Sequence, residues 1–189
     1  ALFTPYFAAA AQLALIAVST TACADIALNG IEFFTILCEI ELDAQKEADD
    51  AAVLVHHFGQ QVHLQLLPQL LVAMEQAVEG DDGGNTVPKA AHVCLLHYVE
   101  LVQDQAHQGI AGYVQQNLKA AAWQKRDTAV QAFGIMLSGA KGSALMQTVH
   151  HSFAGLVAGT IHDPQAEVRD SLACAYLLVL LKLFLILVY

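Results

Sequence analysis

The sequence has little charge and few basic residues for its length. Charged residues make up 14% of the 189 residues and hydrophobic residues 56%, and 18 acidic side chains stand against 8 Lys and Arg, a formal net charge of −10. This acidic balance disfavours nucleic acid as a partner and favours a basic protein or peptide. The apolar content is high for a soluble domain and allows a substantial buried core.

The scarce basic residues are also unevenly placed. Between Asp25 and Asp104 there are 14 acidic residues against Lys46 and Lys89, whereas the remainder has 4 acidic and 6 basic residues. Attraction for a cationic partner is therefore expected to centre on the first half of the chain.

Paired cysteines are missing as well. No C-x-x-C motif occurs, and each cysteine lies in an apolar, helix-like context, where a free thiol behaves as a small hydrophobic group. We interpret the four as reduced core residues of a cytosolic or nuclear protein, with a disulfide framework as the alternative. They are Cys23, Cys38, Cys94 and Cys174.

Motifs for metal binding and catalysis are absent. His57 and His63 are six residues apart and His92 and His97 five, so neither pair has the four-residue spacing that aligns two ligands on one helix. The stretch 137–144 is glycine-rich but lacks the G-K-[ST] ending of a phosphate loop. We expect no metal, no cofactor and no enzymatic activity.

Strand-like alternation is scarce, and apolar residues recur at helical spacing. Loop signals at 79–85, 138–143 and 162–164 separate the helical stretches, and Pro68 is expected to kink or interrupt the third helix. The sequence predicts eight helices in four pairs, at about 4–20, 24–42, 51–78, 87–103, 107–119, 123–137, 143–158 and 166 to the end.

An Arg-Asp pair recurs near the start of two helices. Arg126 and Arg169 are 43 positions apart, and the second helices of successive pairs are offset by 61, 38 and 43 residues. Offsets near forty are typical of HEAT repeats, in which an Asp–Arg ladder can tie the turn of one repeat to its neighbour. We predict an all-α fold, an α-solenoid of HEAT repeats forming one array over 1–189. The predicted repeats are roughly 1–43, 44–104, 105–140 and 141–189.

The two ends of the chain are apolar. The start at Ala1 has no basic segment of the kind that opens a signal peptide and is expected to be a cut within a longer chain. The stretch 171–189 carries only Lys182 and is nearly long enough to cross a bilayer. We interpret it as a buried helix that a following repeat would cover; a helical membrane protein with a C-terminal span is the alternative.

Five stretches, taken in order, resemble the middle HEAT repeats of the importin-β (karyopherin-β) family of nuclear transport receptors. They are "TPYF" (4–7), "DIALNGIEFFTILCEIELD" (25–43), "PKAAHVCLL" (88–96), "WQKRDTAVQAFGIMLSG" (123–139) and "HDPQAEVRDSLA" (162–173). The resemblance implies a right-handed superhelix with the second helix of each pair on its concave face. It implies binding of the basic segment of importin-α or a basic cargo peptide, of FG-repeat nucleoporins and of Ran-GTP. No nucleic acid or membrane partner is expected. The implied location is the cytoplasm, the nucleus and the nuclear pore.

The resemblance assigns roles to five carboxylates. Glu79, Asp81 and Asp82 take the place of the family's acidic loop, which faces basic ligands; the alternative is a solvated linker. Glu32 and Glu39 match positions that resemble Ran-contacting acids, and their seven-residue spacing places them on one helix face. An exposed charged face without a partner is the alternative for this pair.

The resemblance also concerns aromatic residues. Tyr6 and Phe7 lie near the family's FG-repeat pocket, although aromatic residues at helical spacing also form cores. Asn85 (or Thr86) and Cys174 stand where the family usually has Trp residues that hold importin-α by cation–π contact. A generic HEAT scaffold without a transport role is therefore a further alternative.

Overall fold

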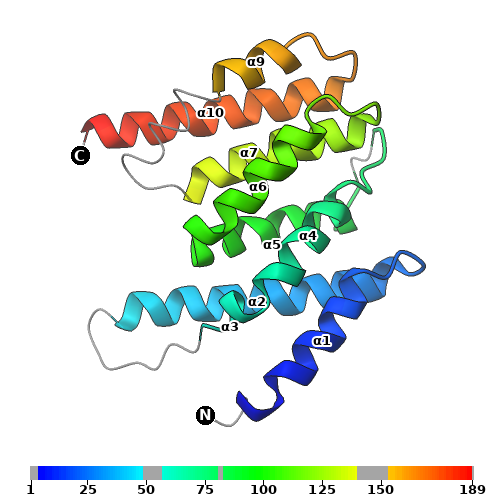
Figure 1. The fold of residues 1–189 in the computed structure, drawn as a ribbon, viewed down its shortest axis with the longest axis vertical. Helices are drawn as coiled ribbons and strands as arrows, with labels where there is room; N and C mark the ends of the chain where they lie inside the picture. Colours follow the sequence, from blue (N-terminus) through cyan, green and yellow to red (C-terminus); the bar gives the residue numbers. More distant parts are fainter. Residues whose placement is uncertain (1–3, 49–56, 81–82, 140–152, 189) are drawn as a thin grey trace. The chain divides into compact units, whose positions relative to one another are not determined.

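The computed structural model describes residues 4–48, 57–80, 83–139 and 153–188, and the regular secondary structure in these ranges is helical (Figure 1). The chain forms two compact units, Ala1–Val102 (unit 1) and Gln103–Tyr189 (unit 2). The predicted all-α fold is therefore confirmed. The four repeat boundaries remain a prediction.

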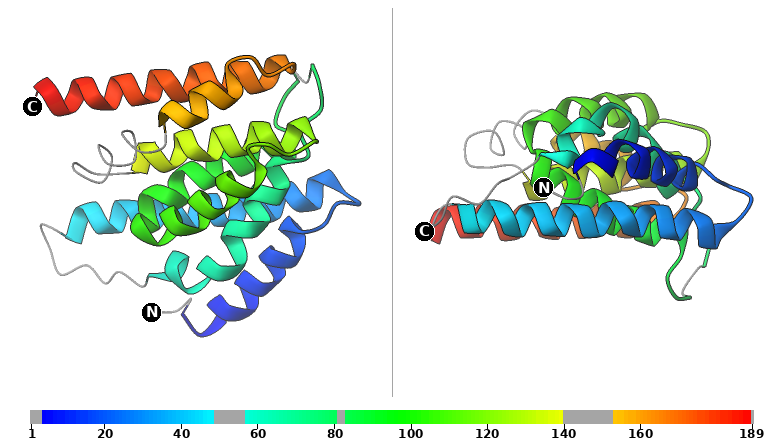
Figure 2. Two further views of the ribbon diagram at one scale, coloured as in Figure 1. Left: turned by 45° about the horizontal axis from the view of Figure 1, so that its top comes forward. Right: turned by 90° about the horizontal axis from the view of Figure 1, so that it is seen from below.

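Unit 1 is built on the long helix α2. Its elements are η1 (Thr4–Tyr6), α1 (Phe7–Val18), α2 (Ala24–Ala48), α3 (Phe58–Gln61), α4 (His63–Met74) and α5 (Val87–Val102). Helix α2 packs on both α1 and α5, and α4 packs on α5 and α1. The chain reverses direction between α1 and α2, so these two helices form a hairpin (Figure 2).

Gly30 sets how closely α1 and α2 approach. A Cβ atom added at Gly30 would lie 2.8 Å from the carbonyl oxygen of Ala14, 2.8 Å from the Ala17 Cβ and 2.8 Å from the backbone nitrogen of Val18. Glycine, which has no side chain, is therefore needed where the α2 backbone crosses the alanine-rich α1.

The third predicted helix is interrupted, but at Val62 rather than at Pro68. Pro68 lies inside α4, and residues 51–56 of the predicted helix lie outside the described ranges. The short α3 before the break is held from α2, because the Glu41 carboxylate accepts the backbone N–H groups of Phe58 (2.6 Å) and Gly59 (2.8 Å). This contact satisfies N–H groups that a helix start leaves without intrahelical partners.

Unit 2 contains α6 (Asp104–Asn117), α7 (Trp123–Gly139), α9 (Ala154–Thr160) and α10 (Ala166–Val188). Helix α7 packs on α6 and α10, and α9 packs on α10. Of the helix predicted over 143–158, residues 143–152 lie outside the described ranges. Within those ranges, no helix combines the length and hydropathy that a membrane crossing requires.

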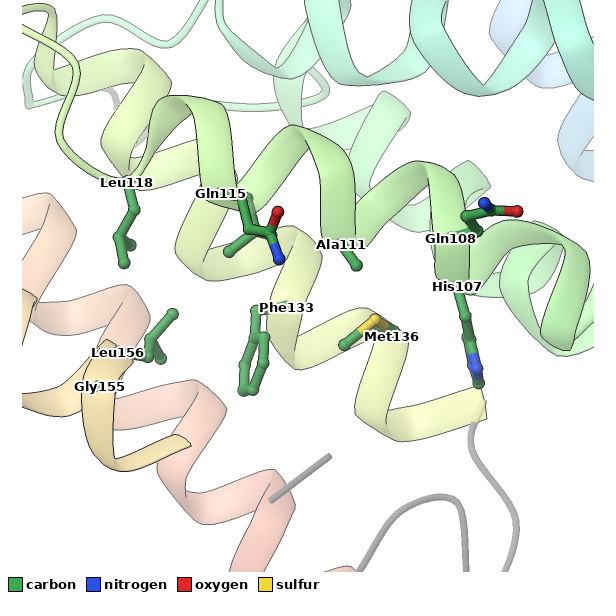
Figure 3. Close-up of a pocket in the computed structure, with 10 residues that line it drawn as sticks. His107, Gln108, Ala111, Gln115, Leu118, Phe133, Met136, Gly155 and Leu156 are labelled. Atoms are coloured by element: carbon green, nitrogen blue, oxygen red, sulfur yellow. The ribbon is translucent and has the colours of Figure 1, made fainter. Parts of the chain in front are cut away.

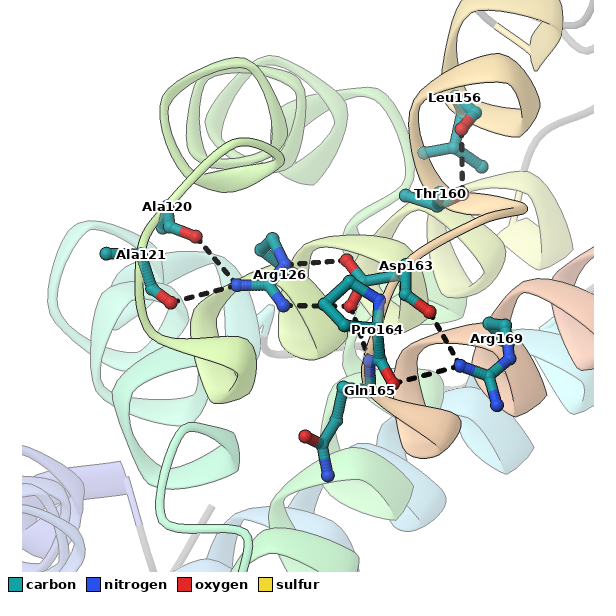
Figure 4. A network of polar contacts seen from close by, with 9 residues as sticks. All are labelled: Ala120, Ala121, Arg126, Leu156, Thr160, Asp163, Pro164, Gln165 and Arg169. Atoms are coloured by element: carbon teal, nitrogen blue, oxygen red, sulfur yellow. Dashed lines mark hydrogen bonds and ion pairs between the residues drawn. The ribbon is translucent and has the colours of Figure 1, made fainter.

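Arg126 ties two turns of unit 2 together (Figure 4). Its Nε and Nη2 atoms donate to the two carboxylate oxygens of Asp163 at 2.7 and 2.8 Å. Its Nη1 atom donates to the carbonyl oxygens of Ala120 and Ala121, both at 2.9 Å. One side chain thus closes the turn before α7 and reaches the turn before α10, so the described residues contain one pair of the expected Asp–Arg ladder.

Arg169 repeats the local half of this arrangement. Its Nη1 atom donates to the carbonyl oxygens of Asp163 (2.6 Å) and Pro164 (3.1 Å), which precede it by six and five residues, as Ala120 and Ala121 precede Arg126. At both helix starts the Arg donates to the carbonyl groups of the turn before it.

Candidate protein-binding surfaces

The first candidate surface is the outward face of α2. Glu32 and Glu39 are both exposed on it, whereas Phe34 on the opposite face is fully buried. Ile36 and Ile40, 47% and 62% exposed, lie between and beside the carboxylates. The two carboxylates therefore lie on one exposed helix face, as predicted. That face combines charged with apolar area.

Helix α5 borders this face. The Nε2 atom of His97 lies 3.6 Å from the Glu39 Oε1 atom, and the two side chains are 34% and 52% exposed. Val93 and Glu100 are also exposed on α5. The Glu39 carboxylate therefore lies where the α2 face meets α5.

The predicted acidic loop is described only in part. Glu79 is exposed in a turn and is followed by Gly80, whose φ of 71° suits glycine. Asp81 and Asp82 lie outside the described residues. The Lys89 ammonium donates to the carbonyl oxygen of Gly83 at 3.4 Å, so a basic side chain of α5 already contacts the end of this loop.

Tyr6 and Phe7 separate in the structure. Tyr6 is 69% exposed, but Phe7 is 4% exposed and its ring stacks on Phe58 with centroids 4.2 Å apart. Phe7 is thus part of the core of unit 1, because the first turn of α1 points it toward α3. Only Tyr6 is exposed, and the place of the two residues near an FG-repeat pocket remains a prediction.

The second candidate surface is a groove in unit 2 that the sequence did not indicate (Figure 3). Its volume is about 570 Å³. Helix α6 contributes six residues between His107 and Leu118, α7 contributes Phe133 and Met136, and α9 contributes Gly155 and Leu156. The groove depends on how three helices pack, and such packing leaves no local sequence motif.

Two of the four thiols lie in the core of unit 1. All four cysteines are free; Cys38 and Cys94 are buried, Cys23 is half-buried and Cys174 is exposed. Burial raises the pKa of the Cys94 thiol to about 12 and also raises the pKa of Cys38, so both stay protonated and unreactive. The expectation of a core position is wrong for Cys174, because it lies on a face of α10 that the described helices leave uncovered.

The described residues that could coordinate a metal do not form a cluster. Over the described residues, no group of three or more His, Cys, Asp or Glu side chains could hold a metal ion. The two surfaces present carboxylates and apolar residues on α2 and a largely apolar groove in unit 2.

The helix pairs and the Asp–Arg ladder define the class of the protein as an α-solenoid of HEAT type. No family model matches the sequence. The chain is 28% identical over 158 residues to importin subunit beta-1 of Schizosaccharomyces pombe, a match that covers 79% of this chain and 18% of that protein. It is 27% identical over 156 residues to importin subunit beta-1 of Arabidopsis thaliana, a match that covers 78% of this chain and 18% of that protein. The chain thus spans about a fifth of the length of these curated relatives.

Solved structures agree with this similarity. A crystal structure of importin-β superposes with a TM-score of 0.86 at 25% identity, over 92% of this chain and 21% of that one. The fold is also shared by Kap95p bound to RanGDP (TM-score 0.83, 23% identity, 90% and 20% covered). Kap95 in complex with Nup1 shares it as well, with a TM-score of 0.83 at 22% identity over 91% of this chain and 20% of that one. The resemblance to importin-β noted in the sequence is therefore confirmed.

Proposed function

We propose that this chain is a protein-binding segment of a nuclear transport receptor, without enzymatic activity, that binds basic segments through the acidic face of α2. The basic partner is an importin-α adaptor or a basic cargo peptide, and Ran-GTP and FG-repeat nucleoporins are the further partners. The receptor works in the cytoplasm, in the nucleus and at the nuclear pore. The observation that carries the proposal is the similarity to importin subunit beta-1 over 79% of the chain.

The charge of the chain supports a cationic ligand for α2. Glu32 and Glu39 lie two turns apart on one exposed face, and Glu100 is exposed on the adjacent α5. Complementary charge on a partner raises the association rate and selects that partner against acidic competitors. The exposed Ile36 and Ile40 add apolar area of the kind that the aliphatic parts of a basic helix can cover.

The proposed Ran and nucleoporin partners rest on the neighbouring structures. Kap95p has been solved with RanGDP and Kap95 with Nup1, and both share the fold of this chain. For this chain we place Ran-GTP on the same α2 acids, Glu32 and Glu39, as an alternative to the basic segment. Because Asn85 and Cys174 are exposed where the family usually has Trp, we expect charge rather than cation–π contact to dominate the binding of importin-α.

Fluorescence anisotropy with a labelled basic peptide from an importin-α N-terminus tests the proposal. Titrations at low and at moderate salt compare the wild type with the double variant Glu32→Gln/Glu39→Gln. We expect affinity to fall steeply with salt, because screening weakens exposed charge pairs, and to fall at least about tenfold in the variant.

The matched control is Asp104→Asn/Asp170→Asn, which removes the same charge from exposed positions of unit 2. An equal loss of affinity in both double variants would show that only the net charge matters, and it would contradict the assignment of the basic peptide to α2. No binding at low salt by a helical wild-type chain would leave a scaffold without a transport role as the better description.

A further inference from the structure

We infer that His97 on α5 makes the binding of a basic segment by the acidic face of α2 depend on pH, because a protonated imidazole competes with that segment for Glu39. The inference rests on the proposed function, in which this face binds a basic segment, and it concerns how that binding is regulated. Its grounds are the position of His97 beside Glu39, the exposure of both side chains, and the groups that surround them.

His97 lies within ion-pair distance of a carboxylate that the proposed ligand uses. Its Nε2 atom is 3.6 Å from the Glu39 Oε1 atom, and the two residues belong to α5 and α2, which pack against each other. A positive charge on His97 therefore acts on Glu39 without any rearrangement of the helices. A basic side chain of the partner seeks the same carboxylate, so the two cations compete for it.

Both side chains remain accessible to a partner and to solvent. His97 is 34% exposed and Glu39 is 52% exposed, and Glu32 is exposed two turns before Glu39 on the same face. Histidine is the side chain whose charge ordinarily changes between about pH 5 and pH 8. A partner that covers the acidic face of α2 thus meets, at the border with α5, a side chain of the type that gains positive charge as the pH falls.

The charged side chains of α2 and α5 that border His97 are carboxylates. From α2, Glu39 approaches the imidazole, whereas the buried Glu41 is bonded to backbone N–H groups of α3. On α5, Glu100 is exposed three residues after His97, a spacing that puts both on one side of the helix. Protonated His97 would therefore lie among acids that otherwise attract a basic ligand.

The other elements packed on α5 are α4 and α3. From α4, the Nδ1 atom of His63 lies 2.9 Å from the hydroxyl oxygen of Tyr98, and the two rings stack with centroids 5.9 Å apart. Tyr98 is fully buried, so His63 is directed into unit 1. Helix α3 carries no charged side chain. His97, rather than His63, is thus the histidine that borders the acidic face of α2.

The test measures how strongly the full chain binds a labelled Arg- and Lys-rich peptide without histidine, at about pH 8 and about pH 5.5 in low salt. We expect the wild type to bind about two- to fivefold more weakly at the lower pH, the range that an exposed charge pair provides. His97→Gln should lose most of this ratio, and His97→Lys should bind weakly at both pH values. The matched control is His162→Gln, at an exposed position of unit 2, which should keep the wild-type ratio.

The outcomes separate this inference from the proposed function. A wild-type ratio in His97→Gln, or an equal loss of the ratio in His97→Gln and His162→Gln, would overturn the inference and leave the proposed function intact. Equally weak binding by His97→Gln and His97→Lys at the higher pH would show that the imidazole has a structural role, and would also overturn it. Absence of wild-type binding at both pH values would overturn the proposed function and this inference with it.

A second measurement starts from the wild type and does not depend on a variant. Linkage requires that a ligand weakened by protonation releases protons when it binds. At about pH 6.5, the calorimetric heat of peptide binding should therefore differ between phosphate and Bis-Tris buffers, whose ionisation enthalpies differ, in the direction of proton release. His97→Gln should release fewer protons than the wild type. Equal heats for the wild type in the two buffers would overturn the inference.

Discussion

The guanidinium group of Arg126 holds both carboxylate oxygens of Asp163, 37 residues further along the chain. The two side chains are 14% and 5% exposed, so the pair is shielded from water and from salt. Bidentate pairs of this kind fix geometry as well as charge. The pair therefore determines how the turn before α7 and the turn before α10 meet within unit 2.

Replacing Arg126 by Ala is expected to lower the free energy of unfolding by about 3 kcal/mol, because Asp163 would keep a buried charge without its partner. Urea denaturation followed by circular dichroism measures the loss. The control is Lys46→Ala, which breaks the pair with Asp43 at 3.2 Å; those side chains are 69% and 74% exposed. Such an exposed pair contributes at most about 1 kcal/mol. Similar losses in the two variants would show that the Arg126 pair is no stronger than a surface contact.

Stability should fall in acid through Asp163. The hydrogen bonds from Arg126 lower the pKa of Asp163 below its usual 3.8. The stabilisation by the ionised carboxylate is present above that usual value and is lost as the pH falls through the lower pKa of the folded state. As the pH falls below about 4, we expect Asp163→Asn to flatten the decline in unfolding free energy that the wild type shows.

The contribution of Asp127 to stability should depend on pH in the opposite direction. Burial raises its pKa above 3.8, against opposing hydrogen bonds from Ser171 and Gln131. Its contribution favours the folded state at low pH and is lost as the pH rises through the raised pKa. Asp127→Asn should therefore reduce the loss of unfolding free energy that occurs as the pH rises toward neutral. A shallower decline toward acid in this variant than in the wild type would contradict the assignment.

Gly30→Ala is expected to destabilise unit 1 by about 2 kcal/mol, because the added methyl group meets backbone atoms of α1 at 2.8 Å. Gly112→Ala is the control, since its Cβ meets nothing within 4 Å and alanine suits a helix interior better than glycine. We expect a gain of about 0.5–1 kcal/mol there. Thermal denaturation of the two variants should shift in opposite directions.

Glu41→Ala should cost about 2 kcal/mol, because it removes two charge-assisted hydrogen bonds to the start of α3. Glu41→Gln retains one acceptor oxygen and should cost less. Glu39→Ala, two residues away and exposed, should change the unfolding free energy by no more than about 0.5 kcal/mol. Equal effects of the Glu41 and Glu39 variants would show that the α3 contact does not stabilise the fold.

Much of the helical framework could be predicted because its signals are local. The start of α7 at Trp123 and the start of α10 at Ala166 agree with the prediction, since an Arg that bonds the preceding turn lies three residues into each helix and Pro164 also precedes α10. The end of α2 did not agree: the helix continues from Leu42 to Ala48, and no glycine or proline stops it there. The exposure of Glu32 and Glu39 on one face likewise followed from the helical period alone.

The features that sequence reasoning missed are non-local. For Phe7 the sequence left a surface pocket and the core open; its ring stacks on Phe58, a partner that a periodic pattern cannot identify. The third helix breaks at Val62, where Glu41 of α2 holds the preceding turn, and not at Pro68, the residue that looked like the breaker. In each case a contact between distant segments outweighed the local preference.

The sequence by itself determined that the chain is helical, that Arg126 and Arg169 recur at one period, and that carboxylates line one side of α2, because these depend on spacing and composition along a single helix. Only the tertiary structure decided that Asp163 is the acceptor for Arg126, that Phe7 is core, and that Phe133, Met136 and Gly155 share a groove. Those outcomes depend on which helix faces pack together, and packing between segments far apart in the chain leaves no periodic signal in the residues that make it.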